Sequence, residues 1–156
     1  MKICLLMIGK TTAAYLQEAL DEYARRLKFY ISLETRVIPG IKRAGGLTES
    51  LLKEREGEQI LSRVDERDTV VLLDERGAEY TSVEFSAYLS RKIQEGRRLV
   101  FVTGGAYGFS DRVRERANER LSLSRMTFSH QMARVIFLEQ LYRAMTIARG
   151  EAYHHE

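Results

Sequence analysis

The feature that most constrains the fold is a regular alternation between short apolar runs and longer segments with helical periodicity. Val70–Leu73 is an uninterrupted apolar run, as found in strands that are covered on both faces. Leu99–Thr103 is a second such run, and it leads directly into a glycine-rich turn. Charged segments whose apolar residues recur with helical spacing separate these runs, which is typical of amphipathic helices. The alternation predicts an α/β domain with a mainly parallel sheet and helices on both faces.

Turn residues and changes of period bound the expected elements. The expected strands are Lys2–Ile8, Leu33–Ile38, Asp68–Asp74, Leu99–Thr103 and Leu121–Met126. The expected helices run from a cap at Thr11 or Thr12 to about Phe29, from Thr48 to Val64, from a capping box at Thr81 to Gln94 with a stop at Gly96, and over Met132–Ala148. Between them we expect a charged stretch opened by Ser110, a turn at Glu75–Tyr80 and a basic, glycine-bearing loop at Ile41–Leu47.

Apolar residues on the helices define the sides that should face the sheet. On the first helix these are Tyr15, Leu16, Leu20, Tyr23, Ala24 and Leu27, and on the second they are Leu51, Leu52, Ile60 and Leu61. The last helix differs, because its apolar residues spread over an arc too wide for one sheet face to cover. This helix is therefore either buried inside the fold or packed against a second copy of the chain, and we favour a homodimer.

Length and composition are typical of one folded domain spanning residues 1–156. Of the 156 residues, 44% are hydrophobic and 30% are charged, which provides a core and argues against disorder. No segment resembles a membrane span or a signal peptide, so we expect a cytoplasmic protein with no membrane association. The single cysteine, Cys4, fits a reducing compartment and is expected to act as a small buried hydrophobic residue.

The basic residues are mostly arginines. Net charge is +3, and arginine supplies 19 of the 25 basic residues. A guanidinium group suits phosphate better than an ammonium does, which favours an RNA or nucleotide partner. On charge alone, however, pairing of these arginines with the 22 acidic residues on solvated helix faces is the simpler interpretation.

Three loops are expected at the carboxyl edge of the sheet, where ligands bind in open α/β folds. They are Asp74–Gly77, Gly104–Phe109 and Thr127–His130. Glycines in the second loop allow backbone to approach a ligand closely, although a structural turn explains them about as well. The spacing matches neither a dinucleotide-binding fingerprint near the first strand nor a phosphate-binding loop that ends in Gly-Lys-Ser/Thr.

The segment that precedes the last helix alternates hydroxyl and apolar side chains. Ser122, Ser124 and Thr127 interleave with Leu123, Met126 and Phe128. Apolar side chains can hold an uncharged purine while backbone groups bind its edge. An amphipathic strand with its serines facing solvent fits the same pattern, and the residues do not decide between the two.

The C-terminal tail Glu151–Glu156 contains two adjacent histidines, His154 and His155. Neighbouring residues of an extended tail point in opposite directions, and no cysteine pair supports them, so we expect no metal site. A frayed terminus is the usual state of such a tail. In a homodimer built on the last helix, however, Tyr153 and the histidines can lie across the pocket of the partner.

Taken together, these motifs resemble the bacterial ribosomal RNA large-subunit methyltransferase H family over the whole chain. The residues that carry the resemblance are Leu72–Gly77, Val102–Gly108, Leu121–Ser124 with His130, Glu139–Ala144, and Tyr153-His154. The resemblance implies a SPOUT-type C-terminal trefoil knot, a homodimer, and S-adenosyl-L-methionine as cofactor. It also implies methylation of N3 of a pseudouridine in 23S rRNA.

The same resemblance assigns site residues. The methyl donor is expected at Leu73, Gly104, Leu123, Ser124, Arg125, Met126, Thr127 and Phe128. We hypothesise that Tyr153 and His154 position the nucleobase and help to deprotonate it, while His155 stands where the family usually carries arginine. Because the charge excess is small and no added RNA-binding domain is present, we expect the assembled ribosome or its subunit as substrate. The alternative is a non-catalytic, ribosome-associated nucleotide-binding module.

Overall fold

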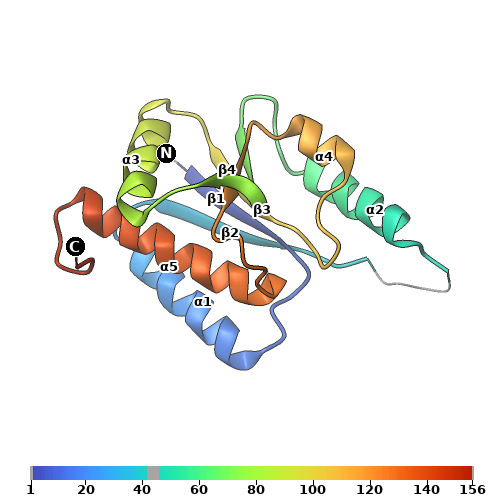
Figure 1. Ribbon diagram of the computed structural model, residues 1–156, viewed down its shortest axis with the longest axis horizontal. Helices are drawn as coiled ribbons and strands as arrows, with labels where there is room; N and C mark the ends of the chain where they lie inside the picture. The colour runs from blue at the N-terminus through green and yellow to red at the C-terminus, as the bar shows by residue number, and fades with distance from the viewer. Residues whose placement is uncertain (1, 42–45, 156) are drawn as a thin grey trace.

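The computed structural model describes residues 2–41 and 46–155 (Figure 1). The strands are β1 (Lys2–Ile8), β2 (Ser32–Ile38), β3 (Thr69–Glu79), β4 (Leu99–Thr103) and β5 (Glu119–Ser122). The helices are α1 (Ala14–Leu27), α2 (Glu49–Leu61), α3 (Ser82–Gln94), α4 (Asp111–Arg116) and α5 (His130–Ala148). Most of the basic loop expected at Ile41–Leu47 lies outside the described residues.

The strands form one sheet in the order β2-β1-β4-β3-β5, and every neighbouring pair is parallel. Phe101 of β4 aligns with Leu5 on one side and with Val71 on the other. Because all strands run in the same direction, their carboxyl ends lie at one edge of the sheet. The prediction of a mainly parallel sheet is therefore confirmed.

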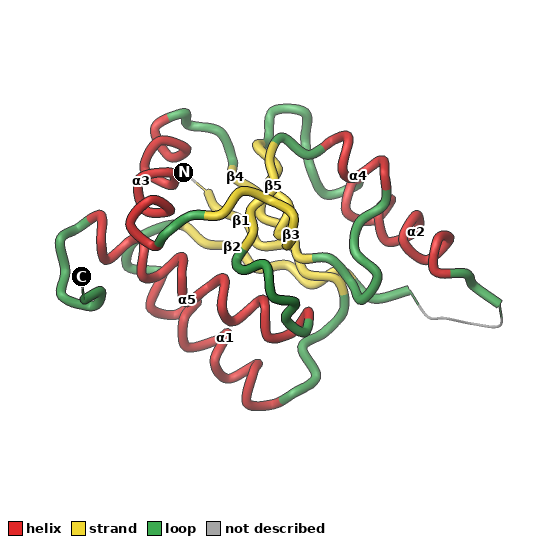
Figure 2. Tube along the Cα trace, viewed as in Figure 1, coloured by secondary structure: helices red, strands yellow, loops and turns green. Residues whose placement is uncertain are grey.

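Helices cover both faces of this sheet, as predicted (Figure 2). On one face, α1, α3 and α5 contribute to a core that contains Leu5 and Phe101. On the other face, α2 and α4 contribute to a core that contains Leu6 and Val102. Successive residues of a strand point to opposite faces, so the continuous apolar runs supply both cores. Cys4 is fully buried in the second core, and burial raises the pKa of its thiol to about 11.

The predicted threonine cap of α1 is wrong. The residue that precedes the helix is Ala13, and no described side chain caps it. The two threonines bind α5 instead: the Thr12 amide donates to Gln131 Oε1 at 2.9 Å, and Arg134 donates to the Thr11 hydroxyl at 2.9 Å. Arg134, which is fully buried, also donates to the carbonyl of Ile8 at the end of β1. Long-range contacts to α5 therefore replace the local cap.

The inward faces of the first two helices are largely as predicted, with one exception on each. Leu16 and Leu20 of α1 are buried, but Tyr15 is 68% exposed. Leu52 of α2 is buried, whereas Leu51 is 38% exposed. In both helices the exposed residue directly precedes a buried one, so it lies about 100° away from the core side.

The expected turn at Glu75–Tyr80 is not formed, because β3 continues to Glu79. Its pairing with β5 shifts register, so that Leu121 aligns with both Leu73 and Ala78. The four residues between them bulge out of the ladder at the carboxyl edge of the sheet. A strand that resumes after a bulge looks like a turn in sequence, because the polar residues of the bulge break the apolar pattern.

The start of α3 and the bounds of β5 can also be compared with the predictions. The capping box at Thr81 is confirmed: its hydroxyl accepts from the Glu84 amide at 3.1 Å, and the Glu84 carboxylate accepts from the Thr81 amide at 2.8 Å. The last strand was misplaced, since β5 spans Glu119–Ser122 rather than Leu121–Met126. The alternation after Ser122 therefore belongs to a loop, not to a strand.

A large part of the wide apolar arc of α5 is covered within the chain. Helices α1 and α3 flank it (Figure 1), and its side chains Phe137, Leu138 and Leu141 are fully buried. Burial inside the fold therefore accounts for these side chains, whereas Met132 of the same helix is 36% exposed, and the homodimer stays a prediction. Within the described residues, no helix is long and apolar enough to cross a membrane.

Candidate functional site

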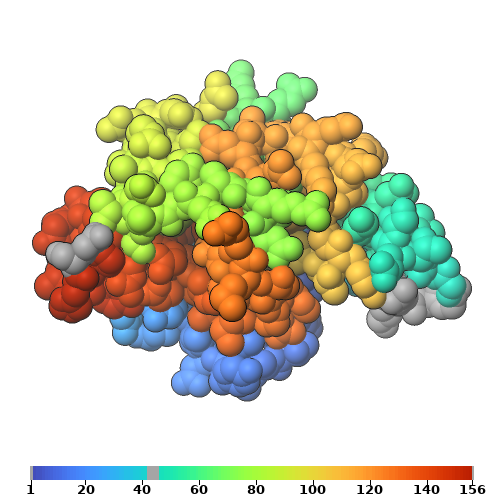
Figure 3. Space-filling view, viewed as in Figure 1, coloured from blue at the N-terminus to red at the C-terminus, as the bar shows by residue number. Residues whose placement is uncertain are grey.

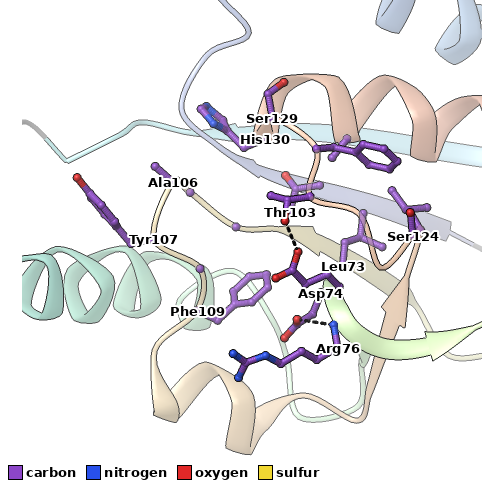
Figure 4. Close-up of a pocket in the computed structure, with 18 of the residues that line it drawn as sticks. Leu73, Asp74, Arg76, Thr103, Ala106, Tyr107, Phe109, Ser124, Ser129 and His130 are labelled. Carbon is purple, nitrogen blue, oxygen red and sulfur yellow. Dashed lines mark hydrogen bonds between the residues drawn. The ribbon is translucent and has the colours of Figure 1, made fainter.

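A cavity of about 500 Å³ lies at the carboxyl edge of the sheet, where the three predicted loops meet (Figure 4). Its lining comes from the end of β3 and its bulge, from the loop after β4, and from the segment between β5 and α5. The lining residues are Leu73–Arg76, Thr103–Phe109, Arg114, Leu123, Ser124, Met126–His130 and Ala133. The prediction that these loops gather at one place is confirmed.

The loop after β4 is backed closely by side chains at two of its glycines. A Cβ on Gly104 would lie 3.2 Å from the ring of Phe109, and one on Gly105 would lie 2.9 Å from the carboxylate of Glu56. Glu56 is buried, and burial raises the pKa of its carboxyl. Because the space behind these glycines is filled, the loop presents its backbone to the cavity.

The bulge of β3 forms a second wall. Oδ1 of Asp74 accepts from the amide of Arg76 at 3.0 Å, which holds the bulge in a local turn (Figure 4). The carboxylate of Glu75 accepts from the hydroxyl of Thr127 at 2.7 Å. This hydrogen bond joins the bulge to the loop before α5, so the two walls support each other.

The segment between β5 and α5 forms the third wall, and its hydroxyl groups shape it. The Ser122 hydroxyl donates to the carbonyl of Ser124 at 3.0 Å, and the Ser124 hydroxyl accepts from the amide of Met126 at 2.9 Å. The hydroxyl of Ser129 caps α5 by accepting from the Met132 amide. The interpretation as an amphipathic strand is therefore excluded, while the binding of an uncharged purine by this segment stays a prediction. Figure 3 shows this segment in orange at the surface, beside the green β3.

Seven of the eight predicted donor-binding residues line the cavity: Leu73, Gly104, Leu123, Ser124, Met126, Thr127 and Phe128. The exception is Arg125, whose side chain is 85% exposed and lies 3.4 Å from the carboxylate of Glu79. Asp74 and Phe109, which belong to the predicted loops but not to the predicted donor-binding residues, also line the cavity, as does Arg114 of α4, which lies outside those loops. For Asp74 a signal was present, because it is the first polar residue after a buried apolar strand.

The tail residues Tyr153 and His154 form a separate cluster on α5. Glu139 Oε1 accepts from the Tyr153 hydroxyl at 3.0 Å and from Arg143 at 2.6 Å. Arg143 NH1 lies 3.1 Å from Nδ1 of His154, and the ring of Tyr153 packs edge-on against Tyr142. Tyr153 and His154 are therefore held along the helix rather than frayed.

The protonation of this cluster follows from its partners. A guanidinium group can only donate hydrogen bonds, so Nδ1 of His154 is the acceptor, and a neutral imidazole carries its proton on Nε2. Burial, together with hydrogen bonds to Tyr23 and Glu139, raises the pKa of Tyr153. Tyr153 is therefore a neutral phenol at pH 7.

The structure does not bring this cluster into the cavity of the same chain. Ala133 of α5 lines the cavity, and Glu139 follows it by six positions. At about 100° and 1.5 Å per residue, six positions place Glu139 roughly 240° around the helix and 9 Å along it. Figure 1 shows the C-terminus at the other end of α5 from the loops of the cavity. Within the described part of the chain, no group of acidic, histidine or cysteine side chains is arranged to hold a metal ion.

Comparison with protein families identifies the class to which this fold and cavity belong. A family model described as "Predicted SPOUT methyltransferase" matches residues 1–154. Since the match spans nearly the whole chain, the chain belongs to the SPOUT methyltransferases.

Curated relatives narrow the class further. The chain is 56% identical to a protein of Parabacteroides distasonis, 54% identical to one of Porphyromonas gingivalis and 50% identical to one of Flavobacterium johnsoniae. Each alignment covers 100% of both chains, and each relative is named "Ribosomal RNA large subunit methyltransferase H". At this identity over the full length, the chain is a member of the ribosomal RNA large subunit methyltransferase H family.

Proposed function

We propose that this protein methylates N3 of a pseudouridine in the 23S rRNA of the ribosome, with S-adenosyl-L-methionine as methyl donor. The observation that supports this most is the cavity formed jointly by the three loops at the carboxyl edge of the sheet. The full-length similarity to proteins named as ribosomal RNA methyltransferases supports the substrate class. Because the substrate is ribosomal RNA, we place the protein in the cytoplasm.

The cavity fits the donor in size and chemistry. Its volume of about 500 Å³ falls within the range of roughly 300–1,000 Å³ that small-molecule sites occupy. Leu73, Leu123 and Phe128 supply apolar side chains for an uncharged purine, while the glycine loop supplies backbone donors and acceptors. When bound, the donor supplies a methyl carbon activated by a positively charged sulfur.

We further propose a homodimer in which the tail of one subunit completes the cavity of the other. The cluster of Tyr153 and His154 lies on a different side of α5 from the cavity of its own chain, so a site that uses both must combine two subunits. Half-exposed apolar residues on the outer side of α5, such as Met132 at 36%, provide a surface for such contact.

In this composite site His154 stabilises charge rather than removing a proton. Its Nε2–H donates to a carbonyl oxygen of the base, where negative charge accumulates as the N3 proton leaves to water. A preorganised donor of this kind contributes about 100-fold to 1,000-fold in rate. Tyr153, Arg143 and Glu139 position the imidazole through the hydrogen bonds described above.

We also propose that residues 1–156 form a single SPOUT domain and that its C-terminal segments form a trefoil knot. Membership of the SPOUT family supports both proposals. A crystal structure of the protein in which the path of the chain can be traced from β3 to the tail tests them directly.

Mass spectrometry of rRNA tests the reaction. Ribosomes that lack the modification are incubated with the protein and an isotopically labelled donor, and we expect one labelled methyl group on a pseudouridine of 23S rRNA. Assembled particles should be methylated much faster than a naked RNA hairpin of the same sequence. Absence of label, together with absence of donor binding in calorimetry, would favour the non-catalytic module instead.

Mixing two inactive variants tests the composite site. Gly105→Val presses a side chain against the carboxylate of Glu56 and so displaces the loop that forms one wall of the cavity. His154→Ala removes the donor from the tail, so neither variant should act alone. In an equal mixture half of the dimers are mixed, and each mixed dimer has one intact site of two, so about a quarter of the native activity should return. Recovery of no activity, with exchange of subunits shown by native mass spectrometry, contradicts a site shared between subunits.

A further inference from the structure

The side chain of Asp74 is a buried carboxylate at the wall of the cavity with an incomplete set of partners. It is only 10% exposed, and it lines the cavity at the start of the β3 bulge. Its Oδ1 accepts from the amide of Arg76, but Oδ2 is buried without a hydrogen-bond donor among the described residues. A buried carboxylate oxygen that lacks a donor is costly, so its presence calls for an explanation.

The cation beside Asp74 compensates this charge only in part. Arg120 NH1 lies 3.9 Å from Oδ2, which is beyond hydrogen-bond distance, and the Arg120 side chain is 47% exposed. Glu75 is the other carboxylate among the lining residues, and it is engaged by the hydroxyl of Thr127. Of these two carboxylates, Asp74 is the one with a buried oxygen that no donor among the described residues engages.

The position of Asp74 depends on the bulge. Had β3 kept its register with β5, the residue after Leu73 would have continued the ladder, but the pairing resumes only at Ala78. Gly77 permits this, since a Cβ at this position would lie only 2.6 Å from the carbonyl carbon of Arg120. The charged side chain of Asp74 thus stands at the cavity wall because the pairing of β3 with β5 is interrupted there.

We propose that Asp74 selects the charge of the ligand: it favours a ligand with a positively charged sulfur over the same ligand with a neutral sulfur. The proposal rests on the proposed function, and it adds a residue that discriminates the donor, S-adenosylmethionine, from the product, S-adenosylhomocysteine. The product lacks the methyl group and the charge on sulfur but keeps the other groups. Because Oδ2 is shielded from water, its field is weakly screened and extends to a ligand that it does not touch.

Asp74→Asn isolates the charge, because asparagine keeps the shape and an oxygen that can accept from the Arg76 amide. Calorimetry of the native protein and this variant is performed with each of the two ligands at pH 7. We expect the Kd for S-adenosylmethionine to rise about tenfold, and the Kd for S-adenosylhomocysteine to change less than about twofold. Glu115→Gln, which removes an equal charge from an exposed position of α4 outside the cavity lining, should change neither value.

A second variant changes the affinity in the opposite direction. Arg120→Gln removes the cation that faces Oδ2, so the uncompensated charge of Asp74 increases, and the Kd for S-adenosylmethionine should fall about threefold. A merely structural role for Asp74 predicts that both substitutions weaken both ligands.

The outcomes separate this inference from the proposed function. Equal weakening of both ligands by Asp74→Asn, or no change in either, overturns the role of Asp74 while leaving the donor site in place. If the native protein binds neither ligand, the proposed function and this inference are both overturned. Weakening confined to the charged ligand supports the inference.

Discussion

At Gly77 the addition of a single methyl group should strongly lower the stability of the fold. A Cβ at this residue would lie 2.6 Å from the carbonyl carbon of Arg120 and 2.7 Å from the amide nitrogen of Leu121. Ordinary contacts of a Cβ begin at 3.4 Å, so Gly77→Ala creates an overlap of about 0.8 Å with the backbone of β5. Strand backbone cannot rotate aside as a flexible side chain can, so the bulge or β5 must move.

The cost of that movement can be estimated. Overpacking a single methyl group typically costs about 1–3 kcal/mol, and here both contacts are with backbone, so we expect Gly77→Ala to lower the free energy of unfolding by about 2–4 kcal/mol. For a chain of this length such a loss lowers Tm by roughly 5–15 °C. The displaced bulge should also weaken donor binding, since Asp74 and Glu75 belong to it.

Urea unfolding followed by circular dichroism measures the stability, and calorimetry measures the donor affinity. Gly96→Ala is the matched control, because Gly96 has φ of +74° and a Cβ added there would meet no described atom within 4 Å. This control carries only the backbone strain of about 1–2 kcal/mol and should leave donor binding unchanged. A stability of Gly77→Ala equal to that of the native protein would refute the close approach of β3 and β5.

Three further outcomes are expected. Burial alone would raise the pKa of Asp68, but hydrogen bonds from Arg98 and from the Asp65 amide hold this pKa below its ordinary value. Asp68→Asn should therefore lower the free energy of unfolding by about 2–4 kcal/mol at pH 7. Urea titrations should show that this difference shrinks as the pH falls below about 4. Thr127→Val releases Glu75 and should raise the donor Kd by about 3-fold to 10-fold. His154→Ala should lower kcat on ribosomes about 100-fold, whereas His154→Gln, which keeps an N–H donor, should retain part of the native kcat. An equal loss of kcat in both variants would instead indicate that His154 acts as a base.

Local sequence predicted those parts of the fold that depend on local interactions. The capping box at Thr81 formed as expected because its partners are three residues apart. The continuous apolar run at Val70–Leu73 correctly predicted a strand covered on both faces, since burial on two sides requires apolar residues at every position. The three loops were predicted together because parallel strands place their carboxyl ends at one edge.

The misplaced elements depended on partners far away in the sequence. Thr11 and Thr12 have the character of helix caps, yet their hydroxyls bind Arg134 and Gln131, more than a hundred residues later. The bulge after Leu73 looked like a turn, because nothing local shows that the strand resumes its pairing at Ala78.

By itself, then, the amino-acid sequence determined the alternation of strands and helices, the edge at which a ligand site must lie, and the three loops that supply most of its lining. These follow from periodicity and from polarity, which act over a few residues. Only the tertiary structure decided that Phe137, Leu138 and Leu141 of α5 are buried within their own chain, that the side chain of Asp74 is buried at the cavity wall, and that the tail cluster lies on a different side of α5 from the cavity. Those features arise from packing between segments distant in sequence, whose contacts no local pattern encodes.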